Sequence, residues 1–123
     1  MSLSRDEIDE ITAPFLAADL AMEVRSVYDE RLTAGEAPGP ATASVFETFR
    51  NVLADADDGP VVFLAIAAIQ LREHHLLDPI RDAALALIDS GDAQRAWRPM
   101  EASVNRDRKQ ALEQLASVLR GEV

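Results

Sequence analysis

The sequence contains no cysteine, few aromatic residues and few basic residues, and each shortage excludes a class of protein. Without cysteine there can be no disulfide, no thiolate nucleophile and no cysteine-based zinc site. Aromatic residues make up only 5% of the chain, so a core must be mostly aliphatic. The chain has only 12 lysine and arginine residues against 22 acidic residues, which gives a net charge of −10. Such a field repels phosphate backbones and anionic membrane surfaces, so we expect neither nucleic-acid nor membrane binding.

Signals for membrane insertion and export are also missing. The longest apolar run, residues 61–69, is far shorter than the roughly 20 residues that a transmembrane helix requires. The first eleven residues are acidic and lack the apolar segment of a secretory signal peptide. Together with the missing cysteine, these features predict a cytoplasmic protein.

What is present predicts a folded, helical chain. Hydrophobic residues make up 48% and charged residues 28% of 123 residues, a globular balance that suits one domain over residues 1–123. Apolar residues recur with helical spacing, and no run alternates as a strand does. We predict helices over residues 16–34, 43–56, 61–74 and 103–119, a short helix capped by Ser4 and Glu7, and one that follows Asp78 as N-cap with Pro79 as its first residue. Gly35 and Gly91 are natural helix ends, and residues 36–42, with two prolines and a glycine, are predicted to form a loop.

The helix predicted over residues 61–74 differs from the others because residues 61–69 are apolar on every side. A helix of this kind belongs in the middle of a core. The fold class we expect is therefore all-α, a compact single-domain bundle of five to six helices around residues 61–71. Gln70 ends the apolar run, and its amide must either reach solvent or be hydrogen-bonded inside the core.

Two features resemble metal sites but do not satisfy the requirements of one. His74 and His75 are adjacent, so on a helix their side chains diverge by about 100° and chelate one ion poorly. We predict two solvated histidines in a corner between helices. The acidic run that begins at Asp55 superficially resembles a calcium loop, but Pro60 and Ile66 stand where an EF-hand requires glycine and glutamate. We predict no metal and no cofactor.

Catalytic motifs are equally sparse. There is no G-x-S-x-G elbow, phosphate loop or dinucleotide fingerprint, and the D-S-G-D at residues 89–92 is typical of a helix end. Asp19 and Glu23 lie four residues apart and would share one helix face, either as surface charge or as carboxylates around a pocket with Gln70. Trp97 either packs over the edge of the core or serves as an interaction hot spot.

Three segments in order resemble a family of small bacterial proteins known only as a domain of unknown function. They are DLAMEVRSVYDERLTAG (19–35), VVFLAIAAIQL (61–71) and ALALIDSGDAQRAW (84–97). The family motifs read D-x-A-x-D-V-R, F-x-L-A-x-A-x-x-Q and A-L-x-I-I-D-S-G…W. Ala18 stands where the family has asparagine, Leu71 where it has tryptophan, and His74 where it has the glycine of a corner. The resemblance implies the fold without an activity, and it predicts a left-handed backbone at His74.

These observations favour a non-enzymatic acidic interaction protein that pairs with a basic macromolecule, or with itself as a homodimer. A toxin-neutralising immunity protein is one concrete form. Its expected binding residues are Asp19, Glu23, Gln70 and Trp97. Two alternatives stay open: an enzyme or small-ligand protein that uses Asp19, Glu23 and Gln70, and a structural protein that dimerises near Trp97.

Overall fold

The described part of the chain is mainly helical. A computed structural model describes residues 4–16, 19–56, 58–73, 76–92 and 105–121. These residues form seven α-helices, one 3-10 helix and no strand, which confirms the predicted all-α class. The elements are α1 (Arg5–Thr12), η1 (Ala13–Phe15), α2 (Asp19–Thr33), α3 (Pro38–Thr48), α4 (Arg50–Leu53), α5 (Asp58–Arg72), α6 (Asp78–Asp89) and α8 (Asn105–Arg120). The helices slightly exceed the predicted five to six because the helix expected over residues 43–56 is divided into two.

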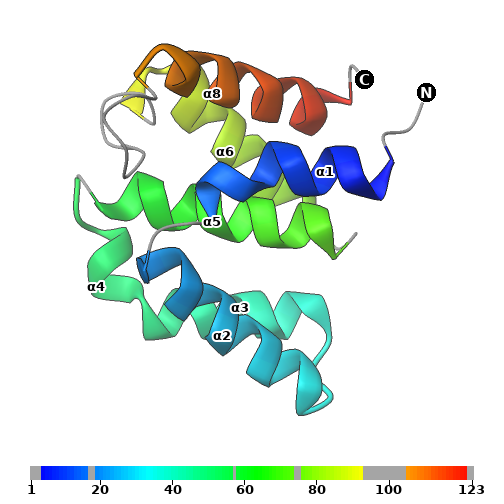
Figure 1. Ribbon diagram of the computed structural model, residues 1–123. Helices are drawn as coiled ribbons and strands as arrows, with labels where there is room; N and C mark the ends of the chain where they lie inside the picture. The colour runs from blue at the N-terminus through cyan, green and yellow to red at the C-terminus, as the bar shows by residue number, and fades with distance from the viewer. Residues whose placement is uncertain (1–3, 17–18, 57, 74–75, 93–104, 122–123) are drawn as a thin grey trace.

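Helix α5 is the centre of the fold, as its apolar sequence predicts. In Figure 1 it runs between α1, α6 and α8 on one side and α2 and α3 on the other, with α4 beside its N-terminal end. Residues 64–70 are buried without interruption, so every face of the helix is covered there. The core around it is mostly aliphatic, and its buried aromatic side chains are Phe15, Tyr28 and Phe49.

Several helix ends follow the local sequence signals. The Glu7 amide donates a 3.2 Å hydrogen bond to Ser4 Oγ, which caps the start of α1. At the end of α2, Gly35 has φ +97°, its amide bonds to the Leu32 carbonyl, and the Glu36 amide bonds to the Arg31 carbonyl. This pair of bonds is the Schellman motif, which requires a left-handed residue and so favours glycine.

The loop predicted over residues 36–42 is wrong, because α3 begins at Pro38. Proline lacks an amide proton, but the first-turn amides of a helix have no carbonyl partner within that helix. Pro38 and Pro40 can therefore both occupy the first turn of α3. Ser44 lies inside α3, and its carbonyl accepts a hydrogen bond from the Thr48 hydroxyl.

Two further positions differ from the sequence predictions or lie outside the described residues. Asp78 is the first residue of α6 rather than its cap, which is Leu77, so the predicted start is shifted by one residue. The predictions for His74, His75 and Trp97 fall outside the described residues.

Arg72 ties the end of α5 to the end of α1. Its Nε donates to the hydroxyl of the fully buried Thr12 at 2.6 Å, and its Nη2 donates to the Asp9 carbonyl at 2.8 Å. The Asp9 carbonyl also accepts from the Ala13 amide, so the guanidinium adds a hydrogen bond at the end of α1, and its positive charge suits that negative helix end.

Gly59 sets how closely α4 and α5 approach. A Cβ atom at this position would collide with the backbone carbonyl oxygen of Leu53, which cannot rotate away as a side chain would. Gly39 offers a matched comparison. Both glycines precede a proline in the first turn of a helix, but nothing lies within 4 Å of a Cβ at Gly39.

We expect Gly59→Ala to destabilise the protein by about 1–3 kcal/mol, because α4 and α5 must move apart to admit the methyl group. Gly39→Ala should change the free energy of unfolding by less than about 1 kcal/mol, because a methyl group there meets no other atom. The following proline restricts the backbone equally in both variants, so the difference between them reports the steric contact alone. Urea unfolding followed by circular dichroism measures both. Equal stability of the two variants would show that the α4–α5 contact is not tight.

Candidate functional site

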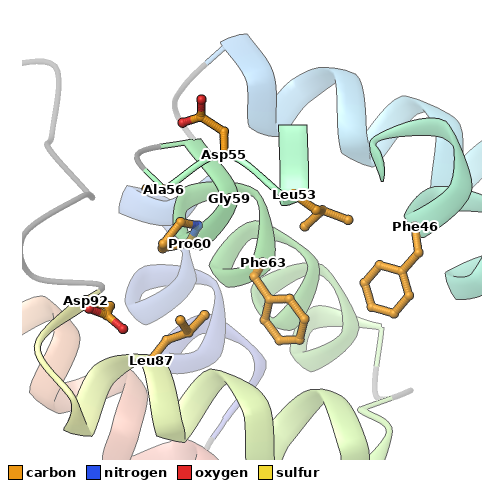
Figure 2. Close-up of a pocket in the computed structure, with 9 residues that line it drawn as sticks. All are labelled: Phe46, Leu53, Asp55, Ala56, Gly59, Pro60, Phe63, Leu87 and Asp92. Carbon is orange, nitrogen blue, oxygen red and sulfur yellow. The ribbon is translucent and has the colours of Figure 1, made fainter. Parts of the chain in front are cut away.

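An open apolar groove of about 560 Å³ lies where α3, α4, α5 and α6 meet. Most of its lining is apolar, and carboxylates stand at two places in it (Figure 2). The lining residues are Phe46, Leu53, Asp55, Ala56, Gly59, Pro60, Phe63, Leu87 and Asp92. These described lining residues include no serine, threonine, lysine, arginine or histidine.

Two stacked phenylalanine rings form one wall. Phe46 comes from α3 and Phe63 from α5, and their ring centroids are 5.9 Å apart with an interplanar angle of 17°. Both side chains are only partly buried, so each keeps apolar surface open to the groove. Figure 2 shows Leu87 approaching from α6 on the other side of Phe63. The groove therefore exposes aromatic and aliphatic surface that a ligand could remove from water.

The mouth of the groove carries negative charge next to the start of α5. The Asp55 carboxylate accepts a 3.0 Å hydrogen bond from the Asp58 amide, and the Gly59 amide bonds to the Asp55 carbonyl. These bonds hold the turn between α4 and α5 in place. Asp92, after the end of α6, accepts a 3.0 Å hydrogen bond from the Ser90 hydroxyl. Exposed carboxylates at Asp55 and Asp58 thus stand beside apolar surface.

Most described arginines are already matched to acids elsewhere on the surface. Their ion pairs are Arg25–Asp29, Arg31–Glu36, Arg72–Asp9, Arg81–Asp78, Arg81–Asp82 and Arg120–Asp89. Other exposed acids, among them Glu30 and Asp58, make no ion pair within the described part of the chain. Exposed acids of this kind place negative charge on the described surface, where a cationic partner can contact it.

Two of the residues predicted for binding, Glu23 and Gln70, lie in different surroundings. Glu23 is exposed on α2, whereas Gln70 is fully buried on α5, and neither lines the groove. The side chain of Asp19 and all of Trp97 lie outside the described residues. The groove residues Phe46 and Phe63 were missed because helical spacing assigns apolar side chains to a core. The one available signal was the acidic turn directly before the apolar run.

Gln70 is a hydrogen-bonding member of the core. Its Nε2 donates to Thr42 Oγ1 at 2.6 Å, and its Oε1 accepts from the Leu77 amide at 3.3 Å. Thr42 in turn donates to the Pro38 carbonyl at 2.7 Å. One side chain thereby connects α5 to α3 and to the start of α6. The expectation that a buried Gln70 must be hydrogen-bonded is confirmed, and we leave it out of the proposed binding surface.

Tyr28 is buried beside this network with an unsatisfied hydroxyl. Only 2% of the residue is exposed, and its Oη makes no hydrogen bond among the described atoms. Burial raises the pKa of the phenol above its ordinary value of 10.0, and the negative charge of Glu73 raises it further. The nearby Thr42 hydroxyl lowers that pKa in part, although it does not reach hydrogen-bond geometry with the phenol.

The described lining of the groove supplies apolar contact and negative charge, which suits it to binding. No cluster of three or more metal-ligating side chains occurs in the part of the chain that the structure describes. None of the described helices has the length and apolar character to cross a membrane. No protein-family model, curated protein or solved structure matches this chain. The groove therefore has to be interpreted from its own chemistry.

We expect Gln70→Ala to destabilise the protein by about 2–4 kcal/mol, because it leaves a cavity and an unpaired Leu77 amide in the core. Gln114→Ala on the exposed face of α8 is the matched control and should change stability by less than about 0.5 kcal/mol. Chemical unfolding of both variants checks the prediction. Similar losses in the two would contradict the bridging role of Gln70.

We expect Tyr28→Phe to leave the protein as stable or about 1 kcal/mol more stable at neutral pH, since it removes an unsatisfied buried hydroxyl. The native phenol holds its proton more tightly than the unfolded one. Its contribution to stability is thus complete below pH 10 and is lost as the pH rises through the native pKa.

Ultraviolet absorbance reports this titration directly, because Tyr28 is the only tyrosine of the chain. The native protein should form phenolate only above the ordinary pKa. Tyr28→Phe should lack the corresponding loss of stability at high pH. A native titration at or below the ordinary value would show that the hydroxyl is solvated.

Proposed function

We propose that this protein is a non-enzymatic acidic interaction module that binds a basic macromolecule, with the groove as the centre of the contact. One observation carries the proposal: partly exposed aromatic and aliphatic side chains lie beside carboxylates, with no cation among the lining residues that the structure describes. Such a surface offers a cationic partner both apolar contact and charge complementarity.

Affinity and rate would come from different parts of this surface. Burial of Phe46, Phe63 and Leu87 against a partner removes apolar area from water, at roughly 25 cal/mol per Å² before the costs of association. Exposed acids act at longer range. They steer a basic partner toward the surface and speed its association at low ionic strength. A contact of this kind weakens with salt but keeps an apolar component.

Charge and composition also support the partners and the cellular location that we propose for the protein. The negative charge disfavours nucleic acid and anionic membrane as partners. A chain without cysteine suits the reducing cytoplasm, where we place it. An immunity protein that neutralises a cationic toxin would fit this description, and a second copy of the chain is the alternative partner. The proposed relation to the bacterial family of unknown function adds no activity to this proposal.

Affinity capture with three forms of the full chain tests the proposed function. The forms are wild type, Ala56→Trp, which fills the groove from an exposed lining residue, and Ala86→Trp, which places the same side chain on an exposed face of α6 away from the groove. We expect wild type and Ala86→Trp to retain a basic protein at low salt, and Ala56→Trp to lose at least about 90% of it, a tenfold change.

The captured protein is then purified and its binding to the three forms is measured at low and high salt, with light scattering of each form alone. Weaker binding at high salt is expected. The proposed function fails if no basic protein depends on the groove and the chain is monomeric at low salt. Loss of a dimer in Ala56→Trp alone would instead identify a second copy as the partner.

A further inference from the structure

The shape of the groove limits the kind of partner segment that it can hold. Its described walls come from helices α3, α4, α5 and α6 and from the turn between α4 and α5 (Figure 2). No strand occurs among the described residues, so they offer no sheet edge to which an extended segment could add. A segment that binds here must therefore use side chains, presented from a backbone that satisfies its own hydrogen bonds.

Resting on the proposed function, we infer that the groove receives the apolar face of a basic amphipathic α-helix of the partner. An amphipathic helix satisfies its backbone internally and presents anchors at positions i, i+3, i+4 and i+7 along one stripe. A groove of about 560 Å³ with an apolar floor suits a few such anchors, with at least one large enough to contact both Phe46 and Phe63.

Charge complementarity determines the other face of that helix. Asp55 and Asp58 are exposed at one end of the groove, and its described lining contains no lysine or arginine that would repel a cation. Lysine or arginine residues that flank the apolar stripe would lie near these carboxylates. An acidic helix with the same apolar stripe would be repelled by these two carboxylates and by the net charge of −10. The groove thus selects for sign as well as for apolar pattern.

Four labelled peptides of about five helical turns test the inference on the full chain. The first combines leucines and one tryptophan in the i, i+3, i+4, i+7 pattern with lysines on the other face. The second has the same residues in scrambled order, the third replaces lysine by glutamate, and the fourth carries a central proline that breaks the helix. Fluorescence anisotropy gives each dissociation constant.

We expect the first peptide to bind wild type at least about tenfold more tightly than each of the other three. Ala56→Trp should weaken it about tenfold, whereas Ala86→Trp should not. Asp58→Asn should weaken it about two- to threefold at low salt, and the control Glu30→Gln on α2 should have no such effect. Amide chemical shifts should change around Gly59 and Phe63 in the complex.

Equal binding of the ordered and scrambled peptides, or of the proline peptide, would overturn the helical partner but leave a groove-dependent basic partner intact. Equal binding of the lysine and glutamate peptides would overturn the charge selection. Insensitivity of the first peptide to Ala56→Trp would remove the groove as its site. Failure of the proposed function is distinguishable, because then affinity capture also yields no groove-dependent basic protein.

Discussion

The rest of the structure depends on the complete burial of the middle of α5. A helix that is apolar on every face must be enclosed, and α1, α2, α4 and α6 pack around it to do so. Gln70 is the one fully buried polar side chain on this helix. Burying an amide without partners is costly, so its bonds to Thr42 and to the Leu77 amide specify where α3 and the start of α6 must lie.

Neighbouring helices cover the two ends of α5 to different extents, and the groove results from that difference. At the C-terminal end, Arg72 closes the contact with α1 through hydrogen bonds to Thr12 and to the Asp9 carbonyl. At the N-terminal end, Gly59 lets α4 approach closely, but α4 is a short helix. Part of the apolar surface around Phe63 consequently stays open, and the groove forms there.

The surface charge and the shape of the groove both support the proposed binding of a basic partner. Most described arginines are held in ion pairs with neighbouring acids, while exposed acids such as Glu30 and Asp58 make no ion pair within the described residues. The groove supplies the apolar contact that a purely electrostatic encounter lacks. A basic amphipathic helix would supply both apolar contact and positive charge from one structural element.

Local sequence signals determined much of this fold by themselves. The cap at Ser4, the left-handed ends at Gly35 and Gly91, and the central position of residues 61–71 follow from backbone chemistry and periodicity. The start of α3 at Pro38 does not, because prolines are equally suited to a loop and to a first turn.

Only the tertiary structure decided the site. In the sequence, Phe46 and Phe63 look like ordinary core residues. Packing of α3 against α5 brings their rings together at the edge of the core that the groove leaves open. Gln70 was a candidate for binding until the neighbouring helices enclosed it. Periodicity states which face of a helix is apolar. How completely other helices cover that face depends on contacts between residues far apart in the chain.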